Sequence, residues 1–223
     1  MALIMCLETA TKNCSVAINK DGSLLAYKEE VSENYSHSEQ LIPFIQSVLI
    51  DQQLELSDLD AIAVSKGPGS YTGLRIGVST AKGLCYSLGI PLLAHSTLEA
   101  MAKGMAKKIP GKVYCPMIDA RRMEVYAALF KEEKQLTNIE ACIVDENSFF
   151  EDLAENEILF FGDGADKCQQ LITHKNASFI SDVYPTAKDM VALSESAFQH
   201  KRFEDVAYFE PFYLKDFVVS VKK

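Results

Sequence analysis

The order of predicted strands and helices repeats along the chain, and this repeat limits the possible folds more than any single motif. Apolar runs, turn signals such as Asp21-Gly22 and helical spacing define the elements. The first half is predicted to hold strand 2–8, hairpin 14–31, helix 38–52, strand 59–67, helix 73–88, strand 91–96 and helix 96–108. The second half starts again with strands 112–120, 123–131 and 138–146, then helix 148–154, strand 158–162, helix 165–173, strand 177–181 and helix 187–200.

Two successive units of strand-strand-strand-helix-strand-helix are typical of the actin-like fold shared by sugar kinases and actin-type ATPases. We therefore expect an α/β protein of two lobes. Pro110-Gly111 breaks the last helix of the first unit and sets the predicted division. The first lobe would comprise residues 1–109. The second, smaller lobe, 110–223, would send its C-terminal segment back onto the first.

Composition excludes several classes of function. The chain has 22 basic and 31 acidic residues among 223, a formal charge of -9, and no run of Lys or Arg, which argues against unaided nucleic-acid binding. The first residues carry neither the basic start of a signal peptide nor an apolar run long enough to span a membrane. The six cysteines are scattered without a Cys-x-x-Cys pair, so we expect free thiols in a reducing cytoplasm.

The stretch "SKGPGSYTGLRIG", residues 65–77, is shaped like a phosphate-binding loop that opens a helix. A Walker A loop would need Gly-Lys-Ser/Thr at a spacing that Thr72 and Leu74 do not satisfy. A dinucleotide-binding fingerprint starting at Gly67 would need glycine at position 72, and no acidic residue ends the next strand to bind a ribose. The sequence therefore favours a tight strand-turn-helix corner over a nucleotide loop.

One face of the following helix is small and uncharged, formed by Gly73, Gly77, Thr80 and Leu84 and flanked by Ile76. Glycine inside a helix costs about 1 kcal/mol relative to alanine, so something is expected to approach this backbone closely. Two alternatives stand: the preceding helix of the same lobe, or a helix of another chain. The predicted partner interface comprises these five residues together with Leu41 and Ile45 of the preceding helix.

The same stretch resembles the loop and helix of the TsaB (YeaZ-like) family of bacterial tRNA threonylcarbamoyladenosine synthesis. "CLETAT", "YSHSEQLIP", "MIDARRMEVYAA", "FFGDGA" and "PFYLKDF" resemble that family's landmarks in the same order, over nearly the whole chain. The glycine loop and "IDARRMEVY" are the most specific of these motifs.

This resemblance implies a non-catalytic scaffold subunit with two actin-like lobes. Its partners would be a TsaD-like catalytic subunit, which holds the metal and modifies the adenosine next to the tRNA anticodon, and a TsaE-like ATPase. The isolated chain would need no cofactor, since ATP and threonylcarbamoyl-adenylate are handled by the complex. The first-lobe helices would contact the TsaD-like subunit or form a homodimer through the same face, and tRNA would be reached only through the complex.

Histidine spacing argues against a metal site. The catalytic relative holds its metal with two histidines four residues apart on a helix, which places them on one face. Here His37 is followed four residues later by Leu41, and His95, His174 and His200 stand alone. We expect no metal.

Two turns correspond to the places where actin-like ATPases handle metal-bound phosphates. The first offers Glu8, Thr9 and Thr11, and the second offers Asp119 and Arg121, with Asp163 in a later strand-helix turn as a further candidate. They are predicted to be remnants of a nucleotide site, because neither phosphate turn carries glycine. Arg121 is expected either to bind an anion or, as we favour, to pair with Glu124 or Glu8. Asp163 suits a tight turn as well as a remnant site.

The alternative function is an active small-molecule kinase or ATPase of the same fold, supported by the surviving Glu8, Asp119 and Asp163. A peptidase finds no nucleophile or metal motif in the sequence. ATP turnover by the isolated chain would distinguish an active enzyme from a partner subunit.

Overall fold

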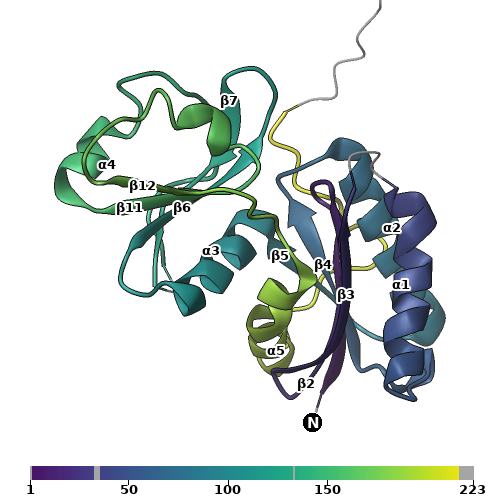
Figure 1. The fold of residues 1–223 in the computed structure, drawn as a ribbon. Helices are drawn as coiled ribbons and strands as arrows, with labels where there is room; N and C mark the ends of the chain where they lie inside the picture. The colour runs from purple at the N-terminus through teal and green to yellow at the C-terminus, as the bar shows by residue number, and fades with distance from the viewer. Residues whose placement is uncertain (1, 33–35, 133, 216–223) are drawn as a thin grey trace, which may run out of the picture.

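The computed structural model describes residues 2–32, 36–132 and 134–215 and contains two β-sheets side by side, each with helices packed on it (Figure 1). The predicted α/β class and the two-lobed arrangement are confirmed. Tyr35 of the "YSHSEQLIP" landmark and residues 216–223 of the tail lie outside the described residues. Among the helices described, none combines the length and the apolar character needed to cross a bilayer.

The first sheet has the strand order β3-β2-β1-β4-β5. Its strands are β1 (Leu3–Glu8), β2 (Asn13–Lys20), β3 (Ser23–Val31), β4 (Ala61–Gly67) and β5 (Leu92–Ser96). β1 pairs antiparallel with β2 and parallel with β4, so the turn after β1 and the loop after β4 meet at one edge of the sheet. β1 is buried along its whole length, as its continuous apolar run predicts.

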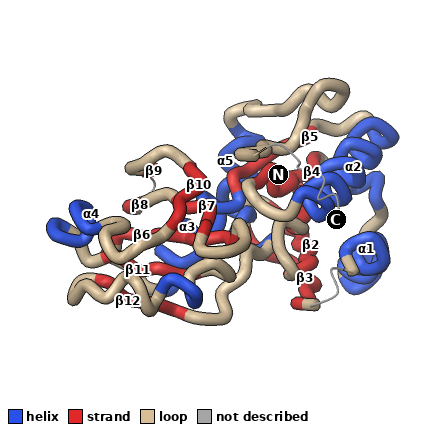
Figure 2. The backbone as a smooth tube through the Cα atoms, turned by 90° about the horizontal axis from the view of Figure 1, so that it is seen from above, coloured by secondary structure: helices blue, strands red, loops and turns tan. Residues whose placement is uncertain are grey.

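Helices α1 (His37–Asp51) and α2 (Tyr71–Leu88) cover one face of this sheet, on the side away from the second lobe (Figure 2). Pro43 lies inside α1, which begins at His37. The Ser70 hydroxyl accepts the Gly73 N–H and caps α2, and Gly89 ends it with a φ of 69°. A short 3-10 turn, η1 (Leu56–Asp58), precedes β4.

The second sheet runs β10-β7-β6-β11-β12, with β8 paired to β6 and β9. Its strands are β6 (Val113–Asp119), β7 (Glu124–Ala127), β8 (Phe130–Lys131), β9 (Lys134–Gln135), β10 (Glu140–Ile143), β11 (Ile158–Phe161) and β12 (Ala177–Ile180). The predicted single strand 123–131 is wrong, because β7 pairs with β10 whereas β8 pairs with β9. Helix α4 (Phe150–Glu155) is present, but the predicted helix 165–173 is reduced to the 3-10 turn η2 (Asp166–Cys168).

Two helices cross between the sheets. α3 (Thr97–Lys108) buries Leu98, Met101 and Met105 against the second sheet. The turn η3 (Ala187–Met190) and helix α5 (Val191–Gln199), predicted as one helix, return to the first sheet and pack Met190 and Leu193 against its strands. The predicted boundary at residue 109 separates the strands of the two sheets. However, α3 from before it packs on the second sheet, and α5 from after it packs on the first.

The described part of the C-terminal segment lies along the first lobe. The Glu204 N–H donates to the Leu92 carbonyl at 2.8 Å, and the Phe212 N–H donates to the Lys66 carbonyl at 2.7 Å. Lys82 of α2 donates its ammonium to the carbonyls of Ala207 and Phe209. These contacts bring residues 212–215 to the cleft described below.

Candidate functional site

A cleft of about 600 Å³ lies between the lobes, where the turns after the first strand of each sheet face one another. Its walls come from residues 10–11 of the β1–β2 turn, residues 68–73 and Ile76 at the start of α2, residues 118–121 of the β6–β7 turn, Tyr126, Asp163 and residues 212–215, with His37 at its edge. Thr11, Asp119, Arg121 and Asp163, predicted as remnants of a nucleotide site, all line it. Glu8 and Thr9 do not.

The glycine-rich loop receives the chain's own β1–β2 turn. The Ser70 N–H donates to the Ala10 carbonyl at 2.6 Å, and a Cβ on Gly69 would lie 2.5 Å from that same oxygen. A Cβ on Gly73 would lie 2.1 Å from the Thr9 carbonyl oxygen. The loop thus uses its glycines to approach protein backbone, and at least one amide at the start of α2 has a protein acceptor.

Gly73 and Gly77, predicted at the partner interface, are covered within the chain itself. Both are buried, and a Cβ on Gly77 would meet the Thr9 hydroxyl at 2.3 Å, so their face of α2 is covered by the β1–β2 turn. Of the preceding helix, His37 lies 3.4 Å from a Cβ added to Gly73, farther than the Thr9 carbonyl. Leu41 and Ile45 are 1% and 3% exposed and belong to the core of the first lobe. The helical spacing of Leu41 and Ile45 thus marks the face of α1 that packs in the core.

The outward strip of α2 is formed instead by half-buried Ile76, Thr80 and Leu84, together with exposed Gly83. No heavy atom of the described residues lies within 4 Å of a Cβ added to Gly83. Three of the seven predicted interface residues therefore remain on an accessible, uncharged surface. Gly83 borders this strip and is its exposed member.

Glu8 is fully buried, and burial raises its pKa to about 7. One carboxyl oxygen accepts the Ala10 N–H at 2.6 Å, and the other has no hydrogen-bond partner among the described residues. Thr9 is also buried and donates its hydroxyl to the Gly73 carbonyl at 2.8 Å. Glu8 and Thr9 therefore stabilise the turn and do not line the cleft.

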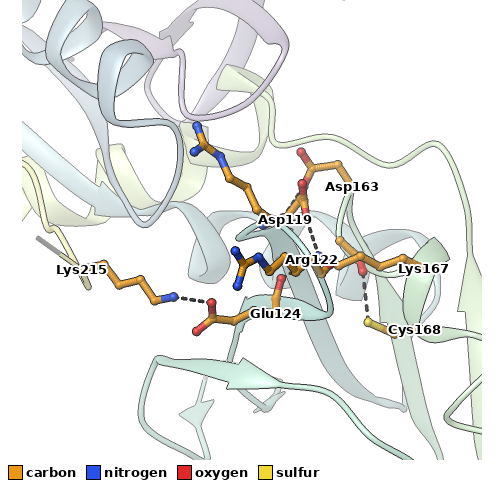
Figure 3. A network of polar contacts seen from close by, with 9 residues as sticks. Asp119, Arg122, Glu124, Asp163, Lys167, Cys168 and Lys215 are labelled. Carbon is orange, nitrogen blue, oxygen red and sulfur yellow. Dashed lines mark hydrogen bonds and ion pairs between the residues drawn. The ribbon is translucent and has the colours of Figure 1, made fainter. Parts of the chain in front are cut away.

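The β6–β7 turn is held by a lysine that sequence reasoning missed. Lys167 pairs with Asp119 and also donates to the carbonyls of Arg122 and Glu124, each at 2.7 Å (Figure 3). Lys167 is 48 residues from Asp119, a separation that carries no periodic signal. Glu124 pairs with Lys215 rather than with Arg121, so the favoured ion pairs of Arg121 with Glu124 or Glu8 are not formed.

Asp163 is half-buried beside this turn and accepts the Asp119 N–H at 3.0 Å. Burial raises its pKa to about 6, and the hydrogen bond from the Asp119 N–H offsets only part of that rise. The carboxyl thus fixes the end of β6, as the tight-turn interpretation of Asp163 predicts.

The donor set does not fit a metal-bound nucleotide. In the part of the chain that the structure describes, no three His, Cys, Asp or Glu side chains are grouped to hold a metal ion. Glu8 is buried, and Asp119 is already neutralised by Lys167. The phosphate-facing amide of Ser70 is bound to Ala10. What the cleft offers a ligand is Arg121, the polar side chains of Thr11 and Ser70, and the ring of Tyr213, which contacts Tyr71 at a centroid distance of 4.9 Å.

A serine-histidine pair exists elsewhere but has no access to substrate. The Ser194 hydroxyl lies 3.0 Å from His95 Nε2 and 3.4 Å from the Cys6 sulfur. Ser194 and Cys6 are 0% exposed, and burial lowers the pKa of His95 to about 3. The pair joins α5 to β5 and β1. No sequence spacing could reveal it, since 99 residues separate the two side chains.

Comparison with known proteins gives consistent similarities. The family model described as TsaD, tRNA N6-adenosine threonylcarbamoyltransferase, matches residues 29–223. The chain is 34% identical over 176 residues to the tRNA threonylcarbamoyladenosine biosynthesis protein TsaB of Bacillus subtilis, covering 76% of this chain and 74% of that protein. Identity to the protein of the same name from Escherichia coli is 37% over 131 residues, covering 59% and 56% of the two chains.

The Haemophilus influenzae protein of that name is 28% identical and aligns over 98% of this chain and 96% of its own length. Among solved structures, YeaZ from Pseudomonas aeruginosa superposes with a TM-score of 0.83 at 26% identity, over 96% of this chain and 100% of that one. Component A of the Acidaminococcus fermentans (R)-2-hydroxyglutaryl-CoA dehydratase superposes with a TM-score of 0.53 at 11% identity, over 91% and 100% of the two chains, and is similar in fold alone. The predicted actin-like fold is confirmed.

Proposed function

The chain belongs to the TsaD family and, within it, to the TsaB (YeaZ-like) proteins, and we propose that it is the non-catalytic partner subunit in tRNA threonylcarbamoyladenosine synthesis. Its partners are a TsaD-like catalytic subunit and a TsaE-like ATPase. ATP and threonylcarbamoyl-adenylate are handled by the complex, tRNA is reached through the complex, and the protein acts in the cytoplasm.

The observation that carries this proposal is the state of the cleft. At the glycine loop the Ser70 N–H donates to the Ala10 carbonyl, and on the opposite wall Lys167 forms an ion pair with Asp119. A kinase or ATPase of this fold would use the β6–β7 turn for metal-bound phosphate, and Asp119 of that turn is paired with Lys167. Glu8 of the other such turn is buried. These two observations favour a partner subunit over phosphoryl transfer.

The outward strip of α2 supports a role in assembly. Ile76, Thr80, Gly83 and Leu84 are uncharged and accessible, and Gly83 lets another helix approach closely. We assign this strip to the contact with the TsaD-like subunit and to a competing homodimer. A charged, bulky residue at position 83 should cost roughly 1–3 kcal/mol by overpacking alone, which is about one to two decades in dissociation constant.

The experiment is a reconstituted reaction with tRNA, the TsaD-like and TsaE-like subunits, and this chain, with the modified nucleoside measured by mass spectrometry. Gly83→Arg should leave the fold intact, dissociate both assemblies together and abolish modification. Tyr86→Arg is the matched control, because Tyr86 is 85% exposed on the neighbouring strip of the same helix. Tyr86→Arg should bind and support modification normally.

Three results would contradict the proposal. Modification at the normal rate with folded Gly83→Arg would place the interface elsewhere. Modification in a reaction that lacks this chain would remove its role. Steady ATP hydrolysis by the isolated chain, abolished by Asp119→Ala, would make the protein an enzyme in its own right.

A further inference from the structure

The ammonium of Lys167 is directed entirely at the β6–β7 turn. It pairs with the Asp119 carboxylate and donates to the main-chain carbonyls of Arg122 and Glu124, both at 2.7 Å. A lysine ammonium has three N–H donors, and here three oxygen acceptors of one short segment receive them. Figure 3 shows Lys167 and Asp119 pointing toward one another across this turn.

The three oxygens resemble the ligand set of a hard cation. Carboxylate and carbonyl oxygens are the groups that Ca²⁺ and Mg²⁺ prefer in proteins. The sequence analysis places Asp119 in one of the two turns that correspond to those where actin-like ATPases handle metal-bound phosphates. The same position in this chain is occupied by a covalently attached positive charge.

The turn has a backbone that needs such support. Arg121 and Arg122 have φ angles of 70° and 51°, a left-handed conformation that side-chain-bearing residues adopt only at a cost. The Glu124 N–H donates to the Arg121 carbonyl, and the Arg121 N–H donates to Asp119. Lys167 donates to the Arg122 carbonyl. It also pairs with the Asp119 carboxylate, which accepts the Arg121 N–H, so it joins both sides of the turn.

Lys112 makes a simpler contact than Lys167. Lys112 pairs with Glu157 at the surface, where the glutamate side chain is 66% exposed. An exposed pair of this kind contributes little to stability. The Lys167 side chain is 24% exposed and gathers main-chain groups as well as a carboxylate, so its removal should disturb the backbone itself.

We propose that Lys167 is the built-in cation of the β6–β7 turn and takes the place of the divalent metal ion that this fold otherwise uses there. It neutralises Asp119, gathers the two carbonyls and fixes Arg121 in the wall of the cleft. Divalent cations consequently neither bind nor stabilise this turn in the natural chain.

Replacing the lysine should restore a need for a cation. Lys167→Ala removes the ammonium and most of its stem, and the three oxygens then face the space that the stem occupied. Ca²⁺ is the suitable probe, because its coordination is more flexible than that of Mg²⁺. We expect Lys167→Ala to melt about 4–10 °C below the natural chain in chelator and to regain at least half of that loss in excess calcium chloride.

Three comparisons isolate the effect. Sodium chloride at equal ionic strength accounts for charge screening. Lys112→Ala is the matched control and should melt within about 1 °C of the natural chain, with no response to Ca²⁺. The double variant Lys167→Ala with Asp119→Asn should lose the calcium response, since it lacks the only carboxylate among the three oxygens.

The proposal fails if Lys167→Ala is as stable as the natural chain, if Ca²⁺ does not restore it, or if Ca²⁺ stabilises the natural chain and Lys112→Ala equally. Should Lys167→Ala fail to fold in chelator, refolding with and without Ca²⁺ decides: folded protein only with Ca²⁺ supports the proposal, and unfolded protein in both conditions contradicts it. The isolated chain suffices, so this result is independent of any partner subunit.

Discussion

Gly77 and Gly83 lie on the same helix but should respond in opposite ways to the same substitution. Alanine is favoured over glycine in a helix by about 1 kcal/mol. At Gly83 no described heavy atom lies within 4 Å of the new Cβ, so Gly83→Ala should stabilise the protein by about 0.5–1 kcal/mol. At Gly77 the new Cβ would lie 2.3 Å from the Thr9 hydroxyl oxygen and 3.5 Å from a methyl group of Val64.

The cost at Gly77 comes from displacing Thr9. Its hydroxyl donates to the Gly73 carbonyl, and moving it loses a buried hydrogen bond of about 1 kcal/mol. Overpacking adds roughly 1–3 kcal/mol, against the gain of about 1 kcal/mol in helix propensity. Gly77→Ala should therefore destabilise the protein by about 1–3 kcal/mol. Gly73→Ala should cost more, because its Cβ meets the Thr9 carbonyl oxygen at 2.1 Å and backbone yields less than a side chain.

Urea unfolding of the three variants measures these differences, provided that the dependence on urea concentration is unchanged. A double-mutant cycle with Thr9→Ala tests the cause. In that background Gly77→Ala meets no hydroxyl and should be neutral or mildly stabilising, giving a coupling energy of about 1–3 kcal/mol. If Gly77→Ala unfolds at the same urea concentration as Gly83→Ala, the close approach of the β1–β2 turn is refuted.

Three further measurements test other contacts. Because burial raises the pKa of Glu8 from 4.5 to about 7, the folded state holds a proton that the unfolded state has released between those values, so stability should fall as pH rises from about 5 to 7. Glu8→Gln should remove that part of the slope in urea unfolding across pH. Lys82→Met should speed hydrogen exchange in residues 204–209, because it removes the ammonium that holds two of their carbonyls, and unchanged exchange there would contradict this role. Cys142 is half-buried and the other five cysteines are buried, so Cys142→Ser should abolish the fast phase of native thiol labelling, and a surviving fast phase would show that another thiol is accessible.

The sequence was sufficient for the fold because hydrophobic period and turn chemistry are local signals. The first unit has its three strands, helix, strand and helix as predicted, and the second keeps the order with one strand divided and its last helix reduced to a 3-10 turn. The Asp21-Gly22 turn joins β2 to β3 as predicted. The errors fall where a local pattern was weak. Residues 123–131 are apolar enough for one strand, but their pairing partners divide them into two.

The candidate site was less predictable because its contacts join distant segments. Small residues on α2 correctly indicated a close approach at Gly73 and Gly77, but the approaching group is Thr9, 64 residues earlier than Gly73. Helical spacing gives the direction of a face and not the identity of its neighbour. Lys167 was missed for the same reason, since a lysine in a turn has no feature that marks it as the partner of Asp119.

The glycine loop and Lys167 have one effect in common. In a phosphate-binding loop, glycines let the backbone approach the phosphate, and helix amides receive its charge. Here Gly69 and Gly73 give the same access to the carbonyls of Ala10 and Thr9, and the Ser70 amide binds Ala10. On the opposite wall, Lys167 supplies the positive charge that a metal would bring. In each lobe a group of the chain thus occupies the place where such a loop or a metal would meet its ligand. The glycine contacts fix the start of α2, so the helix surface proposed for the partner is positioned by contacts within the first lobe.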